Sequence, residues 1–213
     1  MEINDESLIN LINKKITGFK LLGIGSSLRK NSSSNRVLRM VLEKSQRYGA
    51  DTKLIELREI NLPVFNPNKP REISEDIKKL NNQMINADAF ILATPDYHGS
   101  MSGGMKNFLD YYWYELSGKI FGYIVSSHEK GLTVMDHMRT AIRQCYGWSL
   151  PYGISIHSEN DFDKQYNINN PQLQSRMENM SRDIVTYGKL LRLQFLYDIH
   201  NKEPTTFAFQ FTK

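Results

Sequence analysis

The part of the sequence that decides the fold is residues 19–35, which read FKLLGIGSSLRKNSSSN. The first part, FKLLGIG, is mostly apolar, as a strand covered on both faces of a parallel sheet requires. The rest is rich in serine and asparagine and leads into apolar residues at helical spacing, namely Val37, Leu38, Val41 and Leu42. A buried strand, a polar loop and an amphipathic helix in this order are typical of an α/β protein.

The same pattern repeats along the chain. Further short apolar runs lie at about 52–57, 88–94, 119–126 and 151–157, and amphipathic stretches separate them. We therefore predict five parallel strands and four crossover helices. A last helix should begin with Asn170 as its cap and Pro171 at its first position. We expect one face of this helix to pack on the sheet.

The sequence indicates a single domain over residues 1–213, because no linker or internal repeat divides it. It has two appendages, an N-terminal amphipathic helix at about 5–16 and a C-terminal arm at about 204–213. In the arm, Phe207, Phe209 and Phe211 alternate with small or polar residues, which predicts a strand. Such an apolar face needs a cover, either its own sheet or a neighbouring subunit. We favour the neighbouring subunit.

Composition excludes several classes of function. The chain has a single cysteine, Cys145, so an intrachain disulfide and a cysteine-rich metal site or iron–sulfur cluster are excluded. None of the five histidines forms a pair at the i, i+4 spacing, and we expect no metal site. The net charge of +4 is scattered along the chain, so we expect no nucleic-acid partner.

The sequence also bears on location. Its longest uninterrupted apolar run, residues 89–93, is far shorter than the roughly 20 residues of a membrane helix. The acidic start at residues 1–6 lacks the basic and apolar segments of a secretory signal. We therefore expect no membrane association and a cytoplasmic location.

The loop after the first strand suits a phosphate group. Hydroxyls, backbone N–H groups and the positive end of a helix meet there, and Arg29 adds charged donors. The same serines could instead simply cap the helix, and composition leaves both interpretations open. A dinucleotide fingerprint is disfavoured, because Leu28 occupies the place of its third glycine and Glu56 lies too far from Gly25.

A second loop, residues 94–107, could lie against a flat ring. It combines Pro95, an aromatic residue, a histidine and several small residues. Its pattern, Pro95-x-Tyr97-His98-Gly99-Ser100-x-x-Gly103-x-x-Lys106-Asn107-x-Leu109-Asp110, closely resembles the signature of the NADPH-dependent FMN reductase family. Together with Ser27-x-Arg29 and the order of elements, the resemblance covers roughly residues 19–190.

The resemblance implies a fold and an activity. The fold would be a flavodoxin-like three-layer sandwich, with a five-stranded parallel sheet of order 2-1-3-4-5. The chain would bind FMN and use NADPH or NADH to reduce a small acceptor, such as free flavin, a quinone, an azo compound or a metal oxyanion. Family members commonly form dimers or tetramers, so we expect a homodimer or homotetramer.

The resemblance also implies site residues. The FMN phosphate would be held by Ser27, Arg29, Ser33, Ser34 and Asn35. The isoalloxazine ring would be bordered by Pro95, Asp96, Tyr97, His98 and Gly99, and by Ser127 and His128 of a third loop. The chain departs from the family at Ser26, where glycine is usual, at Asp96, where glutamate or an apolar residue is usual, and in the third loop, where small residues are usual.

Two questions stay open at this stage. No side chain is assigned an obligatory catalytic role, because hydride transfer is the chemistry of the cofactors, and His98 could be either a donor or a structural residue. The aromatic block Tyr111–Tyr114 could belong to the core and a subunit interface, which we favour, or stack on the cofactor. An FMN electron carrier and a flavin-free scaffold are the alternatives to an enzyme.

Overall fold

The computed structural model describes residues 18–71, 74–157, 159–202 and 204–211. The N-terminal helix expected at about 5–16 lies outside the described residues. The main strands are β1 (Phe19–Gly25), β2 (Ala50–Glu56), β3 (Ala89–Tyr97) and β5 (Ile120–Ser126), followed by the short β6 (Trp148–Ser149) and β7 (Ile154–Ile156). The sheet order is β2-β1-β3-β5, with β6 and β7 both paired in parallel to β5. This confirms the predicted flavodoxin-like order.

The fifth strand differs from the prediction. Instead of one strand at 151–157, two short pieces pair with opposite ends of β5. The backbone N–H of Leu150 donates to the carbonyl of Phe121. The next residue, Pro151, has no N–H with which to continue the ladder. The chain therefore leaves the sheet and returns at Ile154.

The third strand continues beyond the predicted end at residue 94. It runs through Pro95 to Tyr97 and turns back into β4 (Ser100–Met101), which pairs antiparallel with it. His98 and Gly99 form the tip of this hairpin with φ angles of 57° and 75°. Two consecutive left-handed residues are the geometry of a tight two-residue hairpin turn.

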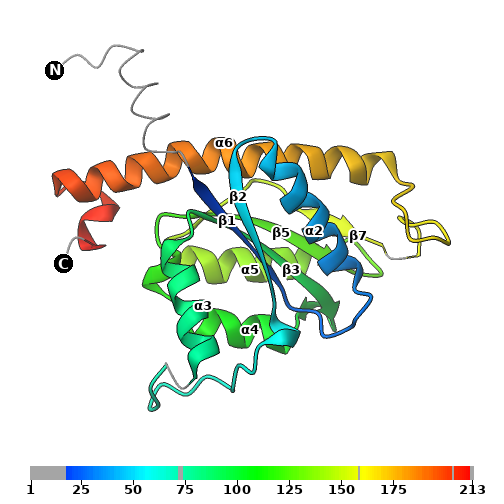
Figure 1. Cartoon of the computed structure of the whole chain (residues 1–213), viewed down its shortest axis with the longest axis horizontal. Helices are drawn as coiled ribbons and strands as arrows, with labels where there is room; N and C mark the ends of the chain where they lie inside the picture. Colours follow the sequence, from blue (N-terminus) through cyan, green and yellow to red (C-terminus); the bar gives the residue numbers. More distant parts are fainter. Residues whose placement is uncertain (1–17, 72–73, 158, 203, 212–213) are drawn as a thin grey trace, which may run out of the picture.

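Helices cover both faces of the sheet (Figure 1). α2 (Ser33–Gln46) and α6 (Pro171–Asn201) pack on one face, against a core that includes Leu21, Ile91 and Ile124. α4 (Gly103–Asp110) and α5 (Leu132–Gln144), together with α3 (Glu75–Asn86), pack on the other, against alternate strand residues such as Leu22, Leu92 and Val125. The period-two alternation of strand side chains thus creates two apolar cores in a three-layer sandwich.

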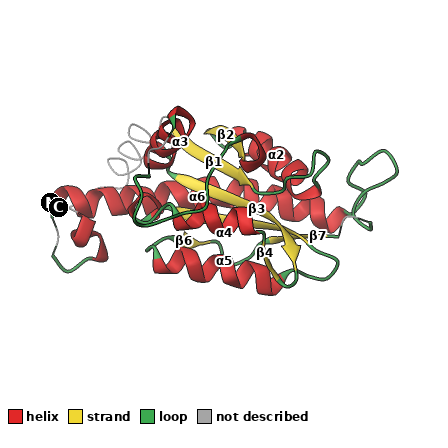
Figure 2. Ribbon diagram, turned by 90° about the horizontal axis from the view of Figure 1, so that it is seen from below, coloured by secondary structure: helices red, strands yellow, loops and turns green. Residues whose placement is uncertain are grey.

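Helix α6 begins as predicted. The side chain of Asn170 accepts hydrogen bonds from the backbone of Gln172 and Leu173, and Pro171 occupies the first turn. Its N-terminal half buries Leu173, Met177, Met180 and Ile184, which confirms the expected face. Its C-terminal end extends beyond the sheet, as the orange and red ribbon in Figure 1 and the turned view in Figure 2 show. Among the described helices, none is long and apolar enough to cross a membrane.

The C-terminal arm is not a strand, so that prediction was wrong. Residues Phe207–Phe211 form a 3₁₀ helix, η3. The chain reverses at Lys202, which ends α6 in a left-handed conformation. The arm then returns to its own chain: Phe207 and Phe211 lie with ring centroids 5.6 and 5.8 Å from Phe195. An aromatic surface on the same chain therefore contacts these rings, although Phe207 stays 40% exposed. The expected contact with a neighbouring subunit stays a prediction.

Candidate functional site

Three loops meet at the carboxyl edge of the sheet. They follow β1 (residues 26–32), β3 (the hairpin to β4) and β5 (residues 127–131). The three strands are neighbours in the sheet, so their ends lie side by side. Ligands of open α/β sheets bind at this edge, where the strand order reverses.

The first loop ends in the cap of α2. Ser32 is the N-cap, and its Oγ accepts a hydrogen bond from the backbone N–H of Asn35 at 3.3 Å. Ser32 Oγ and Ser34 Oγ lie 2.9 Å apart, and Ser34 is completely buried. Arg29 is exposed, whereas Ser27 is buried and its Oγ accepts from the backbone N–H of Arg29. Ser32 thus caps the helix, as one of the two interpretations expected, while hydroxyls, Arg29 and the positive end of the helix also lie together, as a phosphate group would require.

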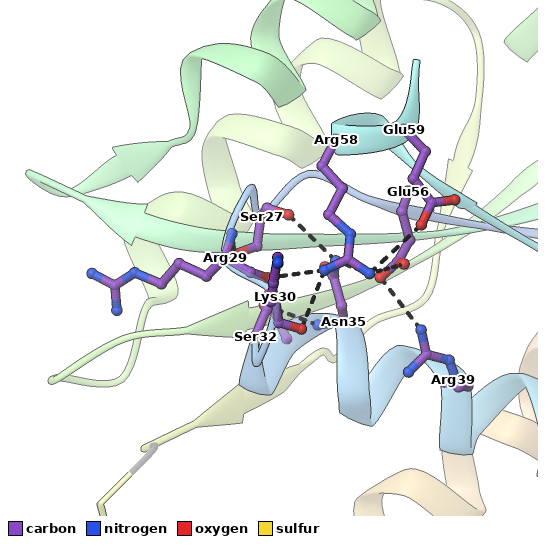
Figure 3. Close-up of polar contacts among 10 residues, drawn as sticks. Ser27, Arg29, Lys30, Ser32, Asn35, Arg39, Glu56, Arg58 and Glu59 are labelled. Atoms are coloured by element: carbon purple, nitrogen blue, oxygen red, sulfur yellow. Dashed lines mark hydrogen bonds and ion pairs between the residues drawn. The ribbon is translucent and has the colours of Figure 1, made fainter.

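A buried carboxylate lies beside this loop (Figure 3). Glu56, at the end of β2, is 6% exposed and accepts a hydrogen bond from Asn35 Nδ2 at 2.8 Å. Its other oxygen lies 2.6 Å from Nη2 of Arg58, and Arg39 approaches from α2 at 3.4 Å. Asn35 Nδ2 also donates to the carbonyl of Ser27. The predicted phosphate-binding Asn35 thus directs its amide group to Glu56 and Ser27.

Buried hydroxyls join the first loop to the second. Ser102 Oγ donates to Ser26 Oγ at 2.8 Å, and Ser26 Oγ donates to the carbonyl of Ala93. Thr94 Oγ1 accepts from the backbone N–H of Ser102 at 3.0 Å. Ser102 is also the N-cap of α4. Ser26, where the family more often has glycine, therefore has a structural role in holding the two loops together.

Asp96 joins the second loop to the third. Its Oδ1 accepts from the backbone N–H of Gly99, and its Oδ2 accepts from Ser127 Oγ, both at 2.8 Å. The backbone N–H of Ser127 donates in turn to Ile156 of β7. Tyr97 and His98 are exposed at the hairpin tip. Asp96 thus fixes the hairpin against the β5 loop, and both of its oxygens have partners.

Two hollows lie along this edge. One, of about 580 Å³, lies between the hairpin and the third loop and is lined by Asp96, Gly99, Glu129, Lys130, Gly131, Leu132 and Thr133. The other, of about 220 Å³, runs along the first turn of α2 and includes Ser32, Ser33, Asn35 and Arg36. His128 is exposed beside the first of them, with its ring 6.0 Å from that of His157. Of the predicted ring residues, Asp96 and Gly99 line the first hollow, and of the predicted phosphate residues, Ser33 and Asn35 line the second.

Sequence reasoning did not assign a role to Glu56, Arg58, Ser26 or Ser102. In the sequence, Glu56 stands out only as an acid too far from Gly25 for a dinucleotide fingerprint, whereas its register opposite Gly25 brings it beside Asn35. A carboxylate directly after the apolar pair Leu54 and Ile55 at the end of β2 was the signal that could have found it, because a buried charge needs partners. Nothing comparable in the sequence marks Arg58.

The aromatic block divides between core and surface. Tyr111 and Tyr112 are 4% and 3% exposed and belong to the core beneath α4, whereas Trp113 and Tyr114 are 53% and 71% exposed. Tyr114 begins the short helix η2 (Tyr114–Leu116), which leads to the start of β5. The exposed pair therefore lies toward the amino edge of the sheet, away from the three loops.

Solved structures share this fold. An oxidoreductase from Corynebacterium diphtheriae aligns with a TM-score of 0.68 at 18% identity, covering 84% of this chain and 98% of that chain. A flavodoxin, WrbA-like protein from Agrobacterium tumefaciens aligns with a TM-score of 0.59 at 17% identity, covering 81% and 99%. The fold and the loops at its carboxyl edge define a flavodoxin-like α/β protein.

The sequence comparisons are more specific. The chain is 31% identical to the FMN-dependent NADPH-azoreductase of Staphylococcus aureus (strain USA300), over 78% of this chain and 93% of the relative. Residues 19–161 match the model of the NADPH-dependent FMN reductase family. The chain belongs to the NADPH-dependent FMN reductase family.

Proposed function

We propose that the protein is an FMN-dependent NAD(P)H oxidoreductase that passes electrons to a small acceptor, such as free flavin, a quinone, an azo compound or a metal oxyanion. One observation carries the proposal: the loop at residues 26–32, which ends at the N-terminus of α2, and an open hollow beside the β3–β4 hairpin lie at the same carboxyl edge of the sheet. Membership of the family supports the cofactor and the co-substrate. The azoreductase relative supports a small organic acceptor, such as an azo compound.

The residues present fit FMN. At one end, the first turn of α2 offers backbone N–H groups and the dipole of a 14-residue helix to a phosphate, and Arg29 is exposed beside it. At the other end, a hollow is lined by Asp96 and Gly99 of the hairpin, which also carries the exposed Tyr97. A phosphate group and a flat aromatic ring need these two environments at one edge.

The chain's own residues would bind and orient rather than react. Bound FMN supplies the redox chemistry of the reaction, by accepting a hydride and passing electrons on. Arg29, Ser33 and backbone N–H groups at the first turn of α2 would hold its phosphate. The predicted Ser27 and Ser34 are buried, and their hydroxyls bond to the backbone of Arg29 and to Ser32, so they would support the loop from within. The hairpin, with Pro95 to Gly99, and Ser127 and His128 of the third loop would border its ring. Asp96 keeps both ring loops in one position through Gly99 and Ser127.

The direct experiment is spectroscopic and kinetic. Purified protein supplied with FMN should show a bound-flavin absorbance spectrum, and it should oxidise NADPH when a quinone or an azo dye is present. An FMN electron carrier would bind the flavin without oxidising NADPH, and a flavin-free scaffold would bind none. Either of these two results would overturn the proposed function.

We further propose a homo-oligomer that forms through an aromatic surface. Its exposed members are Trp113, Tyr114, Tyr146 and Trp148, all more than 40% exposed. Adjacent exposed aromatic residues favour a protein interface. Light scattering of the wild type and of a Trp113→Ser, Tyr114→Ser variant tests this: the wild type should have twice or four times the mass of the variant. A wild-type monomer at micromolar concentration would contradict it.

A cytoplasmic location also belongs to this proposal, because the reaction depends on reduced nicotinamide, a metabolite of that compartment. Fractionation of the source cells with detection of the native protein would check it. Recovery outside the cytoplasmic fraction would overturn this part alone, without bearing on the redox activity.

A further inference from the structure

The side chain of Arg58 contacts the loop that follows β1, although Arg58 itself follows β2. It lies in the short helix η1 (Leu57–Glu59), directly after β2. Its Nη1 donates to the backbone carbonyls of Arg29 and Lys30, at 3.4 and 3.2 Å, while its Nη2 bonds to Glu56. The side chain is only 24% exposed. One guanidinium thus connects a buried carboxylate to two successive carbonyls of the loop (Figure 3).

The direction of these carbonyls matters for an anion. A loop binds phosphate through backbone N–H groups that point toward it, and the carbonyls of the same peptides must then point away. Carbonyl oxygens facing a phosphate would repel it. Arg58 attracts the carbonyls of Arg29 and Lys30 to one side, and it therefore favours the loop conformation in which successive N–H groups face the opposite side.

Glu56 makes this arrangement possible. A buried carboxylate near a phosphate would be unfavourable without partners. Here it has two guanidinium partners, Arg58 and Arg39, and Arg58 also lies 3.6 Å from the exposed Glu59, so the four groups together carry no net charge. The fork of donors in arginine fixes the geometry as well as the charge, which a lysine ammonium group does not. The same carboxylate orients Asn35, which in turn holds the carbonyl of Ser27.

We propose that Arg58 is a positioning residue for phosphate recognition, which preorganises residues 29–30 so that the protein binds FMN in preference to riboflavin. This inference rests on the proposed function, because it concerns the same cofactor. Arg58 acts through the loop and not by contact with the phosphate. Its loss should therefore alter the loop even when no flavin is bound.

The experiment compares two ligands that differ only in the phosphate. Dissociation constants for FMN and riboflavin are measured by flavin fluorescence on the full chain freed of flavin, for the wild type, Arg58→Met and Arg58→Lys. For both variants, FMN should bind about tenfold more weakly or worse, whereas riboflavin should bind within about threefold of the wild type. Arg58→Lys keeps a positive charge beside Glu56, so it serves where Arg58→Met folds poorly.

Arg39→Met is the matched control, because it removes a guanidinium from the same carboxylate without touching the loop carbonyls. Its preference for FMN over riboflavin should stay within about threefold of the wild type. Hydrogen exchange of the backbone amides at residues 28–34 is followed on the same flavin-free proteins. Exchange should be faster in both Arg58 variants than in the wild type and the Arg39 variant.

Three outcomes would overturn this inference and leave the proposed function unaffected. Equal weakening of FMN and riboflavin binding would make Arg58 a general structural residue. Loss of FMN affinity with unchanged amide exchange would make it a direct phosphate ligand. An equal effect of Arg39→Met would reduce its role to charge. A wild-type protein that binds no FMN would overturn the proposed function together with this inference.

Discussion

Arg29 is the exposed cation of the first loop. If it contacts the FMN phosphate, Arg29→Ala should weaken FMN binding by about 1.5–3 kcal/mol, or roughly tenfold to a hundredfold in dissociation constant, because it removes a charge-assisted hydrogen bond. Titration calorimetry measures the change. Arg182→Ala, which removes an exposed arginine of α6, is the control and should bind FMN like the wild type. Unchanged affinity in the Arg29 variant would contradict the assignment.

Lys119 provides a prediction about pH. It is 3% exposed, its Nζ donates to the carbonyls of Met84 and Ile85 at the end of α3, and burial, assisted by Arg192, lowers its pKa to about 7. Unfolding restores an ordinary lysine pKa, so between pH 7 and about 10 the unfolded chain binds more protons than the folded one. Lys119 therefore makes the free energy of unfolding rise with pH between pH 7 and about 10. Below pH 7 it does not contribute to the pH dependence of stability.

Urea unfolding at pH 6, 7.5 and 9 measures this slope, which can approach about 1.4 kcal/mol per pH unit for a single group. Lys119→Met should lose the rise between pH 7.5 and 9. Lys53→Met, at an exposed position on β2, should keep it. A rise of the same size in the Lys119 variant would show that other groups cause it.

The sequence indicated candidate site residues where the contacts of a residue lie within its own loop. Ser27, Arg29 and the hairpin residues could be proposed because they lie in two short motifs that resemble those of the family. Glu56 and Arg58 could not, because their roles depend on the register of β2 against β1, which places Glu56 opposite Gly25. Their side chains then reach residues more than 20 positions away in the chain.

Gly188 shows how an element is fitted to the sheet. It is buried in α6, and a Cβ at this position would lie 2.6 Å from Phe19 Cζ and 3.0 Å from Ile120 Cγ2. Gly188→Ala should therefore lower the free energy of unfolding by about 1 kcal/mol, because overpacking outweighs the helix preference of alanine. Chemical denaturation measures it. Gly103→Ala in α4, where a Cβ meets nothing within 4 Å, should be neutral or stabilising. A more stable Gly188 variant would refute the packing argument.

Most elements could be predicted because a covered parallel sheet makes its strands apolar and its helices amphipathic. The differences have local causes. Pro151 divides the fifth strand, and the left-handed pair at 98–99 turns a predicted loop into a hairpin. The alternation of phenylalanines in the arm indicated a strand, but contacts with Phe195 and Trp148 decided its conformation. Such tertiary contacts are not visible in local periodicity.

The arm supports a prediction about the whole chain. Phe207 and Phe211 pack on Phe195, Trp148, Tyr146 and Tyr114 of the same chain. Truncation after residue 203 should lower the melting temperature by several degrees, because it exposes these aromatic residues. The decrease should be the same across a hundredfold range of protein concentration, since the lost contacts lie within one chain.

Calorimetry at several concentrations checks this, and Phe207→Ala with Phe211→Ala in the full chain should reproduce most of the decrease. A decrease that depends on protein concentration would mean that the arm stabilises contacts between copies in the oligomer. That result would support our expectation from the sequence that the arm contacts a neighbouring subunit.

The hairpin between β3 and β4 has a consequence for how the enzyme could be altered. Its path is set by strand pairing, by the Asp96 bond to Gly99 and by the positive φ angles at 98 and 99, whereas the side chains of Tyr97 and His98 lie exposed. Directed evolution of acceptor range can therefore concentrate on two codons. Position 97 can be randomised fully, and position 98 is best limited to histidine, asparagine, aspartate and glycine, which tolerate left-handed backbone. Every variant in such a library would keep the same hairpin backbone.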